Sequence, residues 1–204
     1  AQKIEENFRE VKYIRAKKGV CLSTGGFIFN RQMVKEYAPK YYAGMPLGTS
    51  NDQGCGIRLG QSVGGKTDHM NRVTAWRFLN PPLAFAQGIV VNKHGKRFCN
   101  EMVYGATLGD AMCEDNEGKA YLILSAELFT ESKVQANKAL PFQRDMAKML
   151  MYFNAKKKTD LEDIAKVYDL PKENLISEVR KYNEAANSGN PCEFGKAPTD
   201  VKFL

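Results

Sequence analysis

Two groups of closely spaced glycines are the part of the sequence best suited to bring backbone amides near a ligand. Gly25 and Gly26 end the apolar run GVCLSTGGF, and a strand that stops at paired glycines lets bare backbone approach another group closely. Gly54 and Gly56 begin a second group, GCGIRLGQSVGG, in which each interior glycine costs a helix roughly 1 kcal/mol relative to alanine. That cost suggests that these glycines are present because another group packs closely against the backbone. Glycine pairs also occur in ordinary turns, so neither group identifies a reaction alone.

Other residues that could carry catalysis or hold a metal are few. His69 lies in a polar stretch and His94 in an expected turn, so we interpret both as surface or linker residues. The five cysteines form an odd set without Cys-x-x-Cys spacing, which indicates neither a disulfide framework nor a zinc site. We therefore expect no metal, and a reducing, cytoplasmic compartment.

Composition and charge argue against several classes of function. The 204 residues are 43% hydrophobic and 26% charged, which is typical of a folded globular protein. The net charge of +7 has one dense run, at residues 156–158, and a run before an amphipathic helix is usually a solvated turn. No nucleic-acid-binding motif accompanies it, and no apolar run approaches the roughly 20 residues of a membrane helix. We expect neither a nucleic-acid partner nor a membrane span.

The elements expected around the two glycine groups form an α/β unit. The run that ends at Gly25 predicts a strand, and Asn30 and Pro39 bound a short helix that follows it. After Gly54, the spacing of Ile57, Leu59 and Val63 suggests a helix packed closely against a sheet. A strand, a glycine turn and a helix in this order are typical of an α/β fold.

From about residue 66 the pattern changes to strands followed by helices. The stretch AFAQGIVVNKHGKRFCNE predicts a β-hairpin with its turn at His94, and AYLILSAELF predicts another strand. Helices are expected after Pro141, with Thr159 capping the second and with the last running from Pro171 to the residue before Gly189. This second part is therefore predicted to be mixed α+β.

Four short motifs in one order resemble a known group of flavoproteins. The stretch GVCLSTGGFIFNRQMVKEYAP is similar to a segment of the fumarate reductase and 3-ketosteroid dehydrogenase flavoproteins, and GCGIRLGQSVGG to their glycine-rich helix start. The stretch GIVVNKHGKRFCNE resembles their IxVNxxGxRFxNE signature, and LISEVRKYNEAANSGNPCEFGK their closing cap helix. The matches span residues 19–196, and their order is more specific than any one of them.

The resemblance implies a cofactor, a fold and a domain division. Residues 1–66 would form part of an FAD-binding domain, residues 67–190 an α+β cap domain over the substrate, and residues 191–204 a return segment to the FAD domain. The implied fold class is thus α+β, a cap with an α/β edge of the FAD-binding domain. The implied FAD contacts are Thr24, Gly25, Gly26, Phe27, Gly54, Gly56 and Glu101.

Two motifs of the family have no counterpart in the sequence. It contains no GxGxxG turn for a dinucleotide phosphate, and none of the family's C-terminal Gly-Gly segment. The resemblance therefore implies an internal fragment of a longer flavoprotein, with the rest of that protein as its partner.

Departures from the family pattern bear on the substrate. Fumarate-reducing members place an arginine five positions after the Asn of the Asn-Glu pair, where this sequence has Gly105 after Asn100. Glycine cannot bind a carboxylate as a guanidinium does. Tyr104 stands one position earlier, as in the steroid-acting branch, and a phenol with a pKa of about 10 can exchange a proton beside an apolar substrate. Tyr104 is the catalytic candidate, with packing after a strand as the alternative. Cys55 replaces a common acidic residue.

The implied function is the addition or removal of two hydrogens across a C=C bond next to a ketone. The resemblance is strongest to the branch that acts at the C4–C5 bond of 3-ketosteroids, with FAD carrying the hydride and Tyr104 the proton. One alternative is a reductase of a small unsaturated acid such as fumarate or urocanate. The other is a catalytically silent cap fragment that docks on the rest of the flavoprotein.

Overall fold

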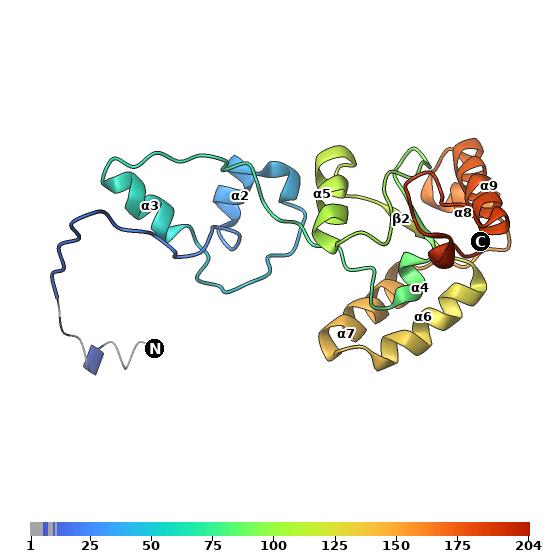
Figure 1. Cartoon of the computed structure of the whole chain (residues 1–204), viewed down its shortest axis with the longest axis horizontal. Helices are drawn as coiled ribbons and strands as arrows, with labels where there is room; N and C mark the ends of the chain where they lie inside the picture. Colours follow the sequence, from blue (N-terminus) through green and yellow to red (C-terminus); the bar gives the residue numbers. More distant parts are fainter. Residues whose placement is uncertain (1–5, 8–9, 11) are drawn as a thin grey trace.

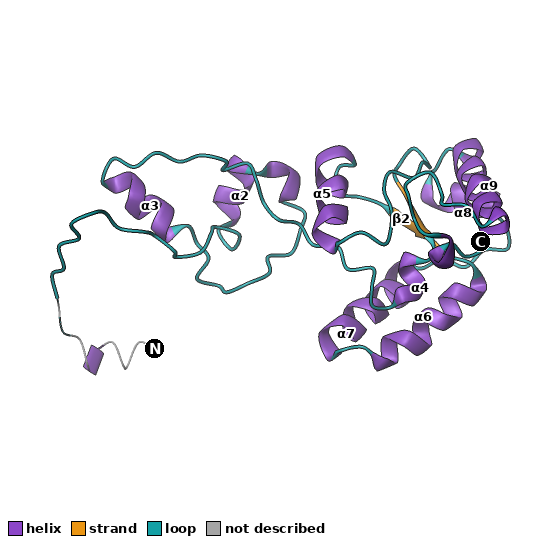
Figure 2. Cartoon of the chain, in the orientation of Figure 1, coloured by secondary structure: helices purple, strands orange, loops and turns teal. Residues whose placement is uncertain are grey.

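A two-stranded antiparallel sheet between two layers of helices organises the greater part of the chain (Figure 1). The computed structural model describes residues 6–7, 10 and 12–204, so part of the predicted segment 1–66 lies outside the described residues. Helices predominate over strands, which agrees with the expected α+β class (Figure 2). The elements are α2 (Arg31–Tyr37), η1 (Pro39–Tyr41), α3 (Cys55–Ser62), α4 (Leu83–Ala86), β1 (Ile89–Val91), α5 (Gly105–Asp115), β2 (Tyr121–Ile123), α6 (Ala126–Lys138), α7 (Pro141–Met149), η2 (Leu150–Asn154, π-helical), α8 (Leu161–Tyr168), α9 (Lys172–Ser188) and η3 (Pro198–Asp200).

The strand β1 is buried on both faces and divides the apolar interior into two clusters. Its partner is β2, with Ile89 opposite Ile123 and Val90 opposite Leu122. Successive side chains of a strand point to opposite faces. Ile89 and Val91 therefore pack against α8 and α9, whereas Val90 packs against α4, α5, α6 and α7. The sheet is small, but both helical layers depend on it.

The predicted hairpin forms its turn but not its ladder. Asn92 N donates to Lys96 O at 2.9 Å, and a single bridge joins Val91 to Arg97. The main partner of β1 is β2 instead, so the predicted second strand of the hairpin is wrong. Beyond this bridge the chain leaves the strand, and the buried guanidinium of Arg97 pairs with Glu101.

Helix ends follow the capping residues closely. Asn30 Oδ1 accepts from Met33 N and begins α2, as predicted, and Gly189 ends α9 in the left-handed conformation. The predicted cap Thr159 is wrong by one residue, because Asp160 Oδ1 accepts from Asp163 N. Both residue types cap helices well, so the pattern alone did not separate them.

The strand AYLILSAELF is confirmed only over the three residues of β2. Ser125 Oγ accepts from Leu128 N and starts α6 at once, so the second half of this stretch is helical. Neither α5 nor α6 was predicted.

The first strand expected from the sequence is absent from the structure. Residues 12–26 form neither a helix nor a strand, and Val20 and Leu22 are exposed. A strand needs a neighbour to complete its hydrogen bonds, and the sheet of the described residues consists of β1 and β2. For the same reason α3 forms as predicted but does not pack against a sheet, and its Leu59 is exposed.

The part of the chain before residue 66 meets the rest at α5 (Figure 1). The hydroxyl group of Tyr41 lies 2.9 Å from Asp110 Oδ1 and 2.8 Å from Glu114 Oε1, and Lys40 forms an ion pair with Glu114. Burial and these two carboxylates raise the pKa of Tyr41. The boundaries 1–66, 67–190 and 191–204 stay predictions. Within the described residues, no helix is both long and apolar enough to cross a membrane.

Candidate functional site

Six of the seven residues expected to contact the cofactor lie together around the first turn of α3. Gly54 N donates to Gly26 O at 2.9 Å. A Cβ atom at Gly54 would lie 3.2 Å from the Cβ of Phe27, and one at Gly56 would overlap with Thr24 Oγ1. The expected close approach at these glycines is therefore present, and it joins residues 24–27 to the start of α3.

This glycine cluster, defined as residues 24–27 with Gly54 and Gly56, fits a ligand that approaches the backbone. Thr24, Gly25 and Gly26 are exposed, and no described atom lies within 4 Å of where a Cβ of Gly26 would be. The amides of the first turn of a helix have no partner within the helix, and this end carries a partial positive charge. Part of a phosphorylated cofactor such as FAD suits both features.

Gly54 can be tested by a matched pair of substitutions. Gly54 and Gly64 have φ angles of 76° and 85°, so alanine at either position adopts the unfavourable left-handed conformation. At Gly54 the new Cβ would also lie 2.7 Å from Met33 Sδ, whereas at Gly64 it meets no described atom within 4 Å. We expect Gly64→Ala to lower the free energy of unfolding by about 1 kcal/mol, and Gly54→Ala by a further ~1–3 kcal/mol from overpacking. Urea unfolding measures both, and equal losses would contradict the close approach.

The catalytic candidate Tyr104 precedes α5 and presents its phenol to solvent. Its side chain is 64% exposed, and no described residue forms a hydrogen bond with its hydroxyl group. Its ring contacts Trp76 edge to face, with centroids 4.6 Å apart and planes at 77°. Further ring contacts join Trp76 to Phe78 and Phe78 to Phe142. We call these four residues the aromatic face.

Gly105 leaves no room for a side chain. Arg77 N donates to Gly105 O at 3.0 Å, so the two backbones run against each other. A Cβ atom at Gly105 would lie 2.9 Å from Arg77 O, and this contact requires a backbone shift. The position where fumarate-reducing flavoproteins are expected to have arginine is therefore occupied here by a backbone crossing.

Glu101, the seventh residue expected at the cofactor, is fully buried inside the compact part of the chain, defined as residues 79–204, which pack around β1 and β2. Its Oε1 accepts from Val90 N and Arg97 Nε, both at 3.0 Å, and its Oε2 accepts from Arg97 Nη2 at 2.8 Å. Lys196 Nζ lies 3.2 Å from the same Oε2. Both carboxylate oxygens of Glu101 are therefore already hydrogen-bonded to groups of the protein. A contact between Glu101 and FAD stays a prediction from the resemblance, while the structure gives Glu101 an internal role.

Lys196 extends this buried network to the polypeptide before β1. Its Nζ donates to Gly88 O at 2.7 Å and to the hydroxyl group of Tyr182 at 2.8 Å, and Tyr182 donates to Gln87 O at 2.6 Å. Burial lowers the pKa of Lys196, which the charge of Glu101 opposes. Burial also disfavours the charged form of Arg97, but the hydrogen bond and charge of Glu101 outweigh it and raise its pKa.

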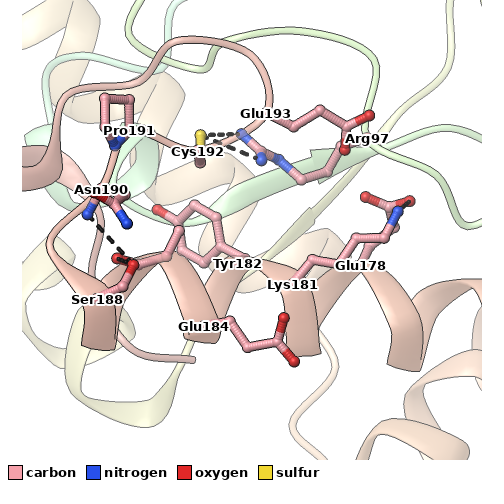
Figure 3. Close-up of a pocket in the computed structure, with 11 residues that line it drawn as sticks. Arg97, Glu178, Lys181, Tyr182, Glu184, Ser188, Asn190, Pro191, Cys192 and Glu193 are labelled. Carbon is pink, nitrogen blue, oxygen red and sulfur yellow. Dashed lines mark hydrogen bonds and ion pairs between the residues drawn. The ribbon is translucent and has the colours of Figure 1, made fainter.

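A cavity of about 330 Å³ borders this network between α9 and residues 190–193 (Figure 3). Arg97 and Tyr182 line it together with residues 190–193, and Arg97 Nη1 donates to Cys192 Sγ at 3.4 Å. Neither Tyr104 nor the glycine cluster borders it. A second hollow of about 450 Å³ lies between residues 39–43 and 113–117, also away from Tyr104.

The remaining candidates from the sequence have no catalytic setting. His69 and His94 are exposed, and all five cysteines are free. Burial raises the pKa of the Cys99 thiol to about 12. Cys55 is exposed at the start of α3, and Arg58 Nη2 lies 3.5 Å from its sulfur. The described residues contain no group of three or more His, Cys, Asp or Glu that could hold a metal ion.

One stretch matches a phosphate-binding motif in sequence but not in structure. Residues 60–67, GQSVGGKT, fit the G-x-x-x-x-G-K-[ST] pattern of phosphate-binding loops. That loop follows a strand and opens a helix. Here the stretch ends α3, with Gly65 N donating to Gly60 O, and continues as loop. The context does not support a phosphate-binding loop.

Two residues of these sites were not singled out from the sequence. Trp76, the single tryptophan, precedes Tyr104 by 28 positions, and no motif of the sequence connects the two. Lys196 is the last residue of the motif LISEVRKYNEAANSGNPCEFGK, and it lies 95 residues from Glu101 in the sequence. The sequence offered one indication of the buried network, namely that Arg97 and Glu101 carry opposite charges and lie four residues apart.

Comparison with known proteins places these features in context. The profile of a family described as an FAD binding domain matches residues 3–200. The 3-oxo-5-alpha-steroid 4-dehydrogenase of Comamonas testosteroni is 42% identical over 161 residues, which cover 78% of this chain and 30% of that protein. Fumarate reductase 1 of Saccharomyces cerevisiae is 26% identical over 226 residues, covering 95% and 45%.

A solved structure shows a similar arrangement. The 3-ketosteroid-delta4-(5alpha)-dehydrogenase from Rhodococcus jostii RHA1, in complex with 4-androstene-3,17-dione, superimposes with a TM-score of 0.70 at 26% identity. The match covers 93% of this chain and 38% of that one. The chain thus spans less than half the length of each of these relatives.

Proposed function

The chain belongs to the FAD binding domain family, and from this premise we propose that it is part of an oxidoreductase acting on the CH–CH bond beside the ketone of a 3-ketosteroid-like substrate. The observation that carries the proposal is Tyr104, an exposed phenol without a hydrogen-bond partner among the described residues, set on an aromatic face. It is supported by the 42% identity to a 3-oxo-5-alpha-steroid 4-dehydrogenase.

The glycine cluster is the part of this chain proposed to contact FAD. Its exposed backbone at residues 24–26 and the amides at the start of α3 would bind part of the cofactor. When bound, FAD supplies hydride transfer to or from a substrate carbon.

The proposed work of Tyr104 is to hold and move one proton. In the reducing direction its hydroxyl group gives a proton to the substrate carbon that does not receive the hydride, and the phenolate that remains takes a proton from solvent. In the oxidising direction the hydroxyl group first loses its proton to solvent, and the phenolate then takes the proton from the substrate carbon. A phenol is neutral at pH 7, so it costs little to cover with an apolar substrate. Trp76, Phe78 and Phe142 offer apolar surface beside it, the kind that lines sites for hydrophobic ligands.

A reductase of a small unsaturated acid is the second candidate, favoured by the relationship to fumarate reductase 1. Such a substrate needs cations placed for its carboxylates. Gly105 has no side chain and no room for one without a backbone shift, which counts against fumarate.

The third candidate is a catalytically silent cap, with residues 67–190 over the substrate and residues 1–66 and 191–204 towards the FAD domain. We propose that the chain by itself has this silent character, and that the rest of the flavoprotein completes the site.

Reoxidation of the reduced flavin distinguishes the two substrates. In the complete FAD-loaded enzyme we expect a 3-keto-4-ene steroid to reoxidise the flavin at least ~10²-fold faster than fumarate, because a site without paired cations loses the charge-assisted hydrogen bonds that orient a dicarboxylate. Gly105→Arg is the control, and it should not create fumarate reduction, since it must also displace Arg77. Stopped-flow absorbance measures both rates. Fumarate outperforming every steroid would transfer the assignment to the second candidate.

A further inference from the structure

The ring of Trp76 lies between Tyr104 and Phe78. Its centroid is 4.6 Å from that of Tyr104 and 4.9 Å from that of Phe78, both within the range of favourable aromatic pairs. Trp76 is 42% exposed, so it is not a core residue, and its described ring contacts are with Tyr104 and Phe78. An exposed tyrosine otherwise samples several staggered rotamers. The contact with Trp76 therefore restricts the direction of the phenol.

Two glycines on one face of α5 hold Trp76 in place. Gly105 and Gly109 are four residues apart, so they lie one above the other on the helix. A Cβ atom at Gly109 would overlap with the carbonyl oxygen of Ala75, and one at Gly105 would lie 2.9 Å from Arg77 O and 3.6 Å from the Trp76 ring. Residues 75–77 thus run in a shallow groove that only glycines leave open, and Arg77 N is anchored on Gly105 O.

We propose that Trp76 is a positioning residue for Tyr104, placed by the groove of Gly105 and Gly109. The inference rests on the proposed function and deepens it. Trp76 orients the hydroxyl group of Tyr104 toward the substrate carbon, and orientation of this kind contributes directly to turnover.

The same groove also acts in substrate choice. A long side chain at residue 105 would displace residues 75–77 and with them the ring that orients Tyr104. A guanidinium at residue 105 and an oriented phenol at residue 104 are therefore mutually exclusive in this backbone. Gly105 thereby commits the site to a neutral proton donor.

A double-mutant cycle in the complete FAD-loaded enzyme separates positioning from mere packing. We expect Trp76→Leu to lower kcat roughly two- to tenfold, the size that one aromatic pair allows, while Trp76→Phe keeps most of it. In a Tyr104→Phe background, Trp76→Leu should leave kcat unchanged, because no hydroxyl group remains to be oriented. Phe153→Leu, at a 79% exposed ring that makes no described ring contact with the aromatic face, is the matched control. Independent, multiplying effects of Trp76→Leu and Tyr104→Phe on kcat would overturn the proposal.

Fluorescence tests the ring pair without any turnover. Trp76 is the only tryptophan among these 204 residues, and in the complete enzyme its emission is the difference between the spectra of the enzyme and of its Trp76→Phe variant. We expect Tyr104→Leu and Gly109→Ala each to shift the emission, the second by moving Ala75, whereas Tyr152→Leu should not. Unchanged emission in both variants would overturn the contact. If the enzyme prefers an unsaturated acid, the proposed steroid function fails, and the same cycle run on that acid still decides the role of Trp76.

Discussion

Turnover of the complete enzyme should fall by roughly 10²- to 10⁴-fold when Tyr104 is replaced by phenylalanine, the range typical of a positioned acid or base. The substitution removes one oxygen that has no hydrogen-bond partner among the described residues, and it keeps the ring that contacts Trp76. The free energy of unfolding and the affinity for FAD should therefore stay as they are. Single-turnover reduction of a 3-keto-4-ene steroid measures the chemical step, and flavin absorbance measures the occupancy.

Tyr152→Phe is the matched control for this loss. Tyr152 is 75% exposed and makes no described ring contact with the aromatic face, so its substitution removes the same hydroxyl group from an unrelated exposed ring. We expect it to leave turnover unchanged. If Tyr104→Phe turns over steroid as fast as the wild type, Tyr104 is a packing residue, and the proton must come from elsewhere in the enzyme.

Replacing Glu101 by glutamine should lower the free energy of unfolding by about 3–5 kcal/mol. The carboxylate accepts four hydrogen bonds at the centre of the compact part, and the side chains of Arg97 and Lys196 are 3% and 0% exposed. Glutamine has nearly the same shape but leaves both cations buried without a compensating charge. Urea unfolding followed by circular dichroism gives the free energy.

An exposed pair with the same spacing provides the control for Glu101. Arg180 and Glu184 are also four residues apart, but their side chains are 72% and 69% exposed. Glu184→Gln should change the free energy of unfolding by less than about 1 kcal/mol. Equal effects at Glu101 and Glu184 would show that burial of the network does not contribute. Replacing Glu101, Arg97 and Lys196 together by apolar residues of similar volume should restore only part of the loss. No unpaired charge then remains, but Val90 N and Gly88 O lose their hydrogen-bond partners.

Local signals predicted the helices whose ends carry strong caps. Asn30 before α2 and Gly189 after α9 act through the backbone of their own turn, so the sequence alone reveals them. α6 was missed because Ser125 caps it in the middle of a stretch rich in apolar residues. The strand expected before Gly25 depends on hydrogen bonds to another strand, and an apolar run carries no information about whether that neighbour exists.

The features of the candidate site fall into the same two groups, those that local sequence predicts and those that only the tertiary fold determines. The close approach at Gly54 and Gly56 follows from glycines that helix propensity disfavours, and the structure contains it. The contact between Glu101 and Lys196 joins residues 95 positions apart and left no periodic trace in the sequence. The position of Trp76 beside Tyr104 depends likewise on a backbone crossing at Gly105 and Gly109, which is a property of the tertiary fold.

The bond from Lys196 to the Gly88 carbonyl has a consequence for the ancestry of the compact part. It brings the polypeptide that leads into β1 next to the polypeptide that follows α9, 108 positions later. A unit whose two ends lie side by side can be inserted into a surface loop of another protein without stretching it, and such sites are where domain insertions are tolerated. The core around β1 also includes α4 before Gly88 and Val201 after Lys196, so an insert that kept this core would have to carry both of them.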